Sequence, residues 1–278
     1  MPIVIAHRGA SGYRPEHTLA AYELGARQGA DFIEPDLVCT RDGELVARHE
    51  NEISGTTDVA AHPEFADRRT EKEIDGKRYE GWFTEDFTLA ELKTLRARER
   101  LPDVRPGNTA HDGEYEIPTF AEVIELAERL GVGIYPETKH PAHHRALGLA
   151  LEPRLVAALR GTRVPVFVQS FDPASLRALA GQLDAPLVQL VSSGAVDVEA
   201  IAAYAQALGP AKQLVDAALV DGAHGAGLAV HAYTFRREPQ FLLDGVPDLE
   251  SELRSFFAMG VDGVFTDHPD VAVRARSA

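Results

Sequence analysis

The chain has 278 residues, of which 45% are hydrophobic, and it carries a formal net charge of −15. A chain of this length can bury one large core, as in a single α/β barrel, or two smaller ones. The negative charge argues against a nucleic acid or an anionic membrane as the partner, because both attract basic surfaces. The single cysteine, Cys39, excludes an intrachain disulfide.

The sequence contains no stretch that approaches the roughly 20 apolar residues of a membrane-spanning helix. A buried strand is expected from residue 3 onward, and no basic segment or long apolar segment precedes it. We therefore expect no membrane span, and a cytoplasmic location for the chain as given. A periplasmic or secreted location is expected instead if the chain is a processed form.

The first predicted element is a strand over residues 3–6, Ile-Val-Ile-Ala, which ends at His7-Arg8-Gly9. Its β-branched residues show no alternation, which predicts a strand covered on both faces, as in a parallel sheet. In four later segments a helical stretch is followed by a glycine and then by an apolar strand. Glycine after a helix adopts the left-handed conformation without penalty, so these glycines predict helix ends. They are Gly29, Gly131, Gly227 and Gly260.

Three more strands are expected over residues 165–171, 186–191 and 207–215, the last being the weakest prediction. Together with the first strand and the four that follow the glycines, they bring the total to eight, in alternation with helices. This pattern predicts an α/β fold of the (β/α)₈ class, a TIM barrel. A doubly wound sheet is the alternative, although no glycine-rich dinucleotide turn follows the first strand.

Residues 51–117 interrupt this alternation, and a plain loop of that length is improbable in a compact domain. We expect an inserted subdomain after the second strand, lying over one end of the barrel within a single domain of residues 1–278. Thr88 and Glu91 have the spacing of a helix capping box. The alternative is a flexible surface loop without a core of its own. Such a loop would leave four aromatic side chains exposed to water: Tyr79, Trp82, Phe83 and Phe87.

Acidic residues occur where the predicted strands end, which is the edge of a barrel where catalytic groups collect. Glu34 and Asp36 lie two residues apart in DFIEPDLV, so their side chains point to the same face, and GIYPETK adds Glu137. Three carboxylates without a nearby cysteine favour one divalent cation, Ca²⁺ or Mg²⁺, over zinc. Two alternatives stay open: the first two acids face solvent, or they form salt bridges with Arg8 or Lys139.

Two histidines accompany these acids: His7 ends the first strand, and His49 follows the short apolar run ELVA. Histidine suits general acid–base catalysis because its pKa lies near neutrality. A divalent metal with Arg8 and Lys139 would neutralise the oxygens of a phosphate ester as charge develops. The combination predicts chemistry on a phosphate ester, whereas each histidine alone would be explained as a hydrogen-bonded structural residue.

Other motifs give weaker predictions. His140, His143 and His144 resemble a metal-binding box, but they are expected to start a helix and have no obvious carboxylate partner. Four residues lie near the ends of the last two strands, and they are expected either to pack inside the barrel or to line its open end: His231, Tyr233, Phe265 and Asp267.

These residues resemble a known family, the glycerophosphodiester phosphodiesterases, in particular its bacterial periplasmic-type branch. The matching stretches run almost end to end: IAHRGASGYRPEHT, GADFIEPDL, SGTTDVA, GIYPETK, VQSFD, HAYTFR and GVDGVFTDHPD. The resemblance implies a (β/α)₈ barrel with an insertion after the second strand. It also implies hydrolysis of glycerophosphodiesters, such as glycerophosphocholine or glycerophosphoethanolamine, to an alcohol and sn-glycerol 3-phosphate.

The resemblance also implies roles for individual residues. It makes His7 and His49 the acid–base pair. The ligands of Ca²⁺ or Mg²⁺ are then Glu34, Asp36 and Glu137. Arg8 and Lys139 become the phosphate contacts, and Glu16 a supporting residue near His7. Two positions depart from the family pattern, because His17 stands where Asn is common and Glu50 where Asp is common. The longer side chain of Glu50 leaves open how His49 is oriented.

The substrate implied by the resemblance is a small molecule, and four aromatic residues are candidates for its pocket: Trp82, Phe83, Phe171 and Tyr233. Of these, Trp82 and Phe83 are expected to border the leaving alcohol. Either water or the substrate's own glycerol 2-hydroxyl can be the attacking group. Two other functions stay open, a phospholipase D-like enzyme acting on lysolipids and a non-catalytic barrel that binds phosphorylated ligands.

Overall fold

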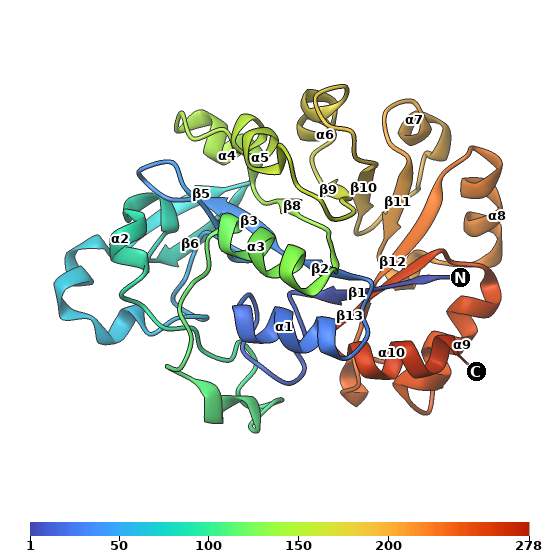
Figure 1. Cartoon of the computed structure of the whole chain (residues 1–278), viewed down its shortest axis with the longest axis horizontal. Coiled ribbons are helices and arrows are strands. Elements are labelled where there is room, and N and C mark those ends of the chain that lie inside the picture. The colour runs from blue at the N-terminus through green and yellow to red at the C-terminus, as the bar shows by residue number, and fades with distance from the viewer. Residues whose placement is uncertain (278) are drawn as a thin grey trace.

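In the computed structural model, which describes residues 1–277, parallel strands close into the predicted (β/α)₈ barrel (Figure 1). The ring closes because the first strand pairs with both the second and the last, with Ile5 opposite Phe32 on one side and Phe265 on the other. In chain order its members are β1 (Ile3–His7), β2 (Phe32–Glu34) continued by β3 (Asp36–Cys39), β7 (Gly133–Ile134) continued by β8 (Glu137–Thr138), β9 (Val168–Ser170), β10 (Leu187–Val191), β11 (Ala207–Pro210), β12 (Ala229–Phe235) and β13 (Gly263–Thr266).

Prolines divide the second and third barrel strands, which the sequence pattern predicts as continuous. Pro35 separates β2 from β3, and Pro136 lies between β7 and β8; proline has no N–H group to donate to the ladder. Pairing resumes beyond each break, so that Asp36 lies directly opposite Glu137. The interruption therefore brings acidic residues of two neighbouring strands face to face.

Helices cover the outside of the barrel (Figure 1), and the four predicted helix-terminating glycines all have positive φ angles, between 68° and 93°. The two chain ends lie close together, because Arg276 donates a hydrogen bond of 3.0 Å to the carbonyl oxygen of Pro2. None of the helices within residues 1–277 is long and apolar enough to cross a membrane. The outer helices are α1 (Leu19–Arg27), α3 (Phe120–Leu130), α4 (Pro141–Ala146), α5 (Leu151–Leu159), α6 (Pro173–Leu179), α7 (Val198–Ala202), α8 (Ala217–Gly225), α9 (Leu249–Met259) and α10 (Pro269–Arg276).

Residues 51–117 extend to one side of the barrel (Figure 1). The chain enters this segment through β4 (Leu45–Ala47), which pairs antiparallel with β3. The segment contains the hairpin of β5 (Thr70–Ile74) and β6 (Lys77–Gly81), and the single-turn α2 (Leu89–Leu92). Thr88 and Glu91 form the predicted capping box at the start of α2. Short 3₁₀ turns make up further parts, over Val59–Ala61, Pro63–Arg68, Thr84–Asp86 and Asn108–His111.

Three aromatic residues of this segment, Phe65, Trp82 and Phe87, pack into a second hydrophobic cluster, which also includes Val38 and Val46 from β3 and β4. The indole N–H of Trp82 donates to the carbonyl oxygen of Phe65 at 2.6 Å, and Phe83 is fully buried. The expectation that Trp82 and Phe83 border the leaving alcohol is therefore wrong, since neither lines the pocket described below. Packing these rings together removes more apolar surface from water than lining an open site would.

A smaller cluster fills the interior of the barrel, with Tyr135, Phe32 and Phe265 among its members. His231 lies among these rings, and its Nδ1 is 2.7 Å from the hydroxyl of Tyr135. His231 is thus part of the barrel filling.

Candidate active site

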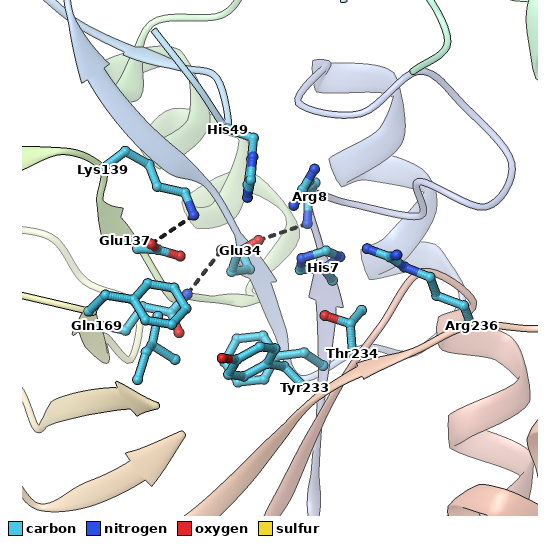
Figure 2. Close-up of a pocket in the computed structure, with 13 residues that line it drawn as sticks. His7, Arg8, Glu34, His49, Glu137, Lys139, Gln169, Tyr233, Thr234 and Arg236 are labelled. Carbon is cyan, nitrogen blue, oxygen red and sulfur yellow. Dashed lines mark hydrogen bonds and ion pairs between the residues drawn. The ribbon is translucent and has the colours of Figure 1, made fainter. Parts of the chain in front are cut away.

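Polar side chains from several strands meet at the carboxyl ends of the barrel strands, around a pocket of about 190 Å³ (Figure 2). His7 ends β1, Glu34 ends β2 and Glu137 begins β8. In the view of Figure 2, Lys139 and Glu137 lie on one side and Arg236 on the opposite side, with His7 and Glu34 between them. Of the candidate residues, those lining the pocket are His7, Arg8, Glu34, His49, Glu137, Lys139, Phe171 and Tyr233.

The three predicted acids come together. One carboxylate oxygen from each of Glu34, Asp36 and Glu137 lies within 4.8 Å of the other two. Their exposed fractions are 1%, 1% and 4%, which excludes the alternative that they face solvent. The proline breaks and the pairing of β3 with β8 hold the three side chains in this arrangement.

Salt bridges, the second alternative, are also present. The ammonium group of Lys139 lies 2.8 Å from Glu137 and 3.4 Å from Asp36, and the Nε of Arg8 lies 3.4 Å from Asp36. The structure thus combines an acidic cluster with two flanking cations. This arrangement leaves three buried carboxyl groups against two basic ones.

Crowding shifts the ionisation of these acids. Burial raises the pKa of Glu137 to about 8, and burial with the neighbouring Asp36 and Glu137 raises the pKa of Glu34 well above its usual range. Burial also opposes ionisation of Asp36, but Lys139 nevertheless holds the pKa of Asp36 well below its usual range. The Oδ1 atom of Asp36 is buried and makes no hydrogen bond within the described residues. An oxygen-only donor set with a buried oxygen that no hydrogen bond satisfies fits a divalent cation, because a cation would favour the ionised form of all three acids.

His7 is held by a carboxylate. Its Nδ1 donates to Oδ1 of Asp267 at 2.6 Å, and Asp267 in turn contacts Arg105 at 2.6 Å and Arg236 at 3.0 Å. Burial and the adjacent Arg8 lower the pKa of His7 to about 4, so its ring is neutral at pH 7. With Nδ1 engaged, Nε2 is the nitrogen left for proton exchange.

His49 has the same type of support from a different part of the chain. Its Nδ1 donates to Oε1 of Glu50 at 2.5 Å, and Arg100 contacts Oε2 of Glu50 at 2.6 Å. Arg100 also contacts Glu16 at 2.7 Å. Glu50, although longer than the Asp common in the family, therefore still places a carboxylate beside Nδ1 of His49. This contact orients the His49 ring.

Arg8 takes a left-handed backbone conformation, with φ of 58°. Its backbone N–H donates to Glu34 at 2.8 Å, and its guanidinium contacts Glu16 at 2.9 Å, so Glu16 lies against Arg8. The other departure from the family pattern, His17, is fully buried and donates from Nε2 to Asp36 at 2.8 Å. A polar side chain at position 17 thus contacts one of the three acids.

Several residues of the site carry no recognisable signal in the sequence. Gln169 donates from Nε2 to Glu34 at 2.9 Å, and Arg100 and Arg105 reach the carboxylates behind the histidines from the segment 51–117. Gln169 lies on β9, and only the alternation of side chains between the two faces of that strand could have suggested that it points inward. The two arginines lie outside regular strands and helices, where no periodicity marks them.

The histidine box does not form a metal site. His140 contacts Asp75 at 2.6 Å and His143 contacts Glu85 at 2.8 Å, while His144 is buried. These partners lie apart from one another, and the cluster with metal-binding geometry among residues 1–277 is the one formed by Glu34, Asp36 and Glu137.

Comparison with known proteins adds independent support. The sequence profile of the glycerophosphoryl diester phosphodiesterase family matches residues 7–271. The chain is 35% identical to the glycerophosphodiester phosphodiesterase GDPD6 of Arabidopsis thaliana over 96% of its own length and 83% of that protein. It is 30% identical to the glycerophosphodiester phosphodiesterase of Haemophilus influenzae, with coverage of 98% and 88%.

Solved structures agree. A phosphodiesterase from Oleispira antarctica, determined with its product sn-glycerol-3-phosphate, superposes with a TM-score of 0.74 at 26% identity, covering 100% of this chain and 98% of that one. An enzyme from Silicibacter pomeroyi, described as a glycerophosphoryl diester phosphodiesterase by similarity, superposes with a TM-score of 0.77 at 23% identity, with coverage of 99% and 92%, and supports the fold. The chain therefore belongs to the glycerophosphoryl diester phosphodiesterase family and is a phosphodiesterase.

Proposed function

We propose that this enzyme hydrolyses soluble glycerophosphodiesters to an alcohol and sn-glycerol 3-phosphate, using one divalent cation and two histidines. The observation that carries the proposal is the convergence of His7, His49 and the acidic cluster on one pocket, with a carboxylate behind each ring. The Oleispira relative, which binds sn-glycerol-3-phosphate as its product, supports the same substrate class.

Glu34, Asp36 and Glu137 are the residues that would hold the cation, Ca²⁺ or Mg²⁺. When bound, such an ion withdraws charge from the phosphate oxygens and makes phosphorus more open to attack. Arg8 and Lys139 line the same pocket and would contact the non-bridging oxygens as negative charge increases there.

The two imidazoles would move the protons. Nε2 of one neutral ring accepts a proton from the attacking hydroxyl. The other ring, which must first be protonated at Nε2, donates that proton to the alcohol oxygen as its bond to phosphorus breaks. Asp267 and Glu50 stabilise whichever ring is positively charged, since each accepts from Nδ1. The attacking hydroxyl belongs either to water or to the glycerol 2-position of the substrate.

The test begins with protein stripped by a chelator, followed by separate addition of Ca²⁺, Mg²⁺ or Mn²⁺. Turnover of glycerophosphocholine, followed by release of sn-glycerol 3-phosphate, is expected to vanish on stripping and return with at least one of these ions. Glu34→Gln, which keeps the side chain's shape but removes a charged ligand, is expected to prevent this recovery. Undiminished turnover by the stripped enzyme would refute the metal-dependent mechanism.

A lysolipid assayed beside the soluble diester separates the phospholipase D-like alternative from the proposal. Faster cleavage of lysophosphatidylcholine than of glycerophosphocholine would favour that alternative. Binding of the diester without any hydrolysis would favour a non-catalytic barrel.

A further inference from the structure

A groove of about 730 Å³ adjoins the catalytic pocket and has no role in the chemistry described so far. The two cavities share four lining residues: His49, Glu137, Lys139 and Phe171. One wall of the groove comes from the β5–β6 hairpin and the other from the start of α4. An ion pair of 2.6 Å between Asp75 in the hairpin turn and His140 before α4 joins these walls.

The groove lies on the His49 side of the site, since His49 lines it whereas His7 does not. A diester has two arms on opposite sides of the phosphate, and the groove adjoins the pocket of about 190 Å³ on the side of His49. An arm that leaves past His49 therefore enters the groove. A third cavity, which both histidines line, differs in chemistry, because Arg100, Arg105 and Arg236 also line it.

Aromatic and acidic side chains give the groove its chemistry. Phe171 is 42% exposed at its edge, and its ring packs edge-on against Tyr233 with the centroids 6.0 Å apart. The ammonium group of Lys139 lies 5.6 Å from the centre of the Phe171 ring, so this ring already attracts one cation. Tyr79 lines the hairpin wall. Exposed aromatic faces beside carboxylates are typical of sites that bind alkylammonium groups.

The charges of the groove favour a cation as well. Four carboxylates line it, of which Glu50, Asp75 and Glu137 already contact Arg100, His140 and Lys139, and the fourth is Asp172. Lys139 is neutralised by Glu137 and Asp36. Asp172 accepts a hydrogen bond from the backbone of Ala174 at 2.8 Å and is paired with no basic side chain within the described residues.

We propose that this groove binds the leaving alcohol and that Phe171 and Asp172 favour alcohols carrying an alkylammonium group over neutral ones. The inference rests on the proposed hydrolysis of glycerophosphodiesters. An acyl chain is a poorer occupant, because it would take water from the carboxylate of Asp172 without giving it a partner.

The test uses a matched pair of substrates, glycerophosphocholine and its 3,3-dimethylbutyl ester, which has the same shape without the charge. The metal-loaded wild-type enzyme is expected to show a kcat/KM about 2- to 30-fold higher for the choline ester, the range of a cation–π contact. Phe171→Leu keeps an apolar side chain but removes the π face, and it is expected to abolish most of this ratio. Asp172→Asn retains a helix-capping residue without its charge and is expected to reduce the ratio as well.

Product inhibition gives a second readout, with choline expected to inhibit the wild type more strongly than 3,3-dimethylbutanol does. Equal kcat/KM for the two esters in the wild type would overturn the inference while leaving the proposed function intact. If Phe171→Leu lowers kcat/KM by the same factor for both esters, the inference is also overturned. If neither ester is cleaved, the proposed function itself fails.

Discussion

The barrel strands and the segment 51–117 contribute different kinds of side chain to the site. The strands carry groups that face the pocket, such as His7, Glu34 and Glu137. The segment instead carries Arg100 and Arg105, which contact the carboxylates behind the two histidines. The difference teaches that the reacting groups and the cations that contact their supporting carboxylates come from separate parts of the chain. Experiments on the two parts should therefore give different kinds of defect.

The largest expected effect comes from the barrel. His7→Ala and His49→Ala are each expected to lower turnover by about 10²- to 10⁴-fold, the usual contribution of a positioned acid or base. His224→Ala, which alters an exposed histidine on α8, is the control and should leave turnover unchanged. Steady-state rates of diester cleavage by the metal-loaded enzyme measure the effect, and wild-type rates in both variants would remove the acid–base assignment.

The barrel interior should also be more sensitive to acid than the hydrophobic cluster of residues 51–117, which contains no titratable side chain. Burial lowers the pKa of His231 to about 4, below its unfolded value of about 6.5. Its contribution is therefore fully present above pH 6.5 and is lost as the pH falls toward 4, a change of roughly 3 kcal/mol.

Denaturant unfolding between pH 7 and 4 tests this prediction. The free energy of unfolding should fall less steeply with acid in His231→Gln, which cannot titrate, than in the wild type. Identical slopes for the two proteins would show that His231 is not the group responsible.

A smaller effect on catalysis is expected from the segment 51–117. Arg100→Gln removes the cation that contacts both Glu16 and Glu50, and should lower kcat by about 10- to 100-fold, as loss of a supporting hydrogen bond commonly does. Arg100→Lys keeps the charge without the planar fork, so we expect it to restore part of the rate. The pH profile of kcat should shift in Arg100→Gln, whereas a purely structural defect would lower the amount of folded enzyme without moving the profile.

The smallest effect should separate stability from chemistry. Trp82→Phe leaves the carbonyl oxygen of Phe65 without its partner and should cost about 1–2 kcal/mol of unfolding free energy. Turnover per folded molecule should not change, because Trp82 packs in the cluster of residues 51–117 and not at the pocket. A large fall in kcat would mean that this cluster controls the site more directly than its contacts indicate.

Much of the barrel could be predicted because its signals are local. Gly29 and Gly131 end helices in the left-handed conformation, a preference that belongs to the residue itself. The spacing of Glu34 and Asp36 places both side chains on one face, and the structure confirms that they meet. Pro35 was equally visible, but its effect on register depends on the neighbouring strand.

The remainder of the site depends on contacts between distant residues. Asp267 lay in a stretch that fitted barrel filling equally well, and its partner His7 is 260 positions away. Arg100 reaches Glu16 across 84 positions, with no pattern linking the two. The aromatic residues of the segment 51–117 suggested a pocket, although burying their apolar surface in a separate cluster proved more favourable.

The pairing of β1 with β13 has a consequence for biosynthesis. The strand that carries His7 emerges from the ribosome before its neighbour β13 and before the carboxylate that orients its ring, which lies 260 positions later. Non-local pairing of this kind forms slowly during folding. A nascent chain therefore holds its first strand with one edge unpaired until β13 has been synthesised, and cannot be catalytically competent before then.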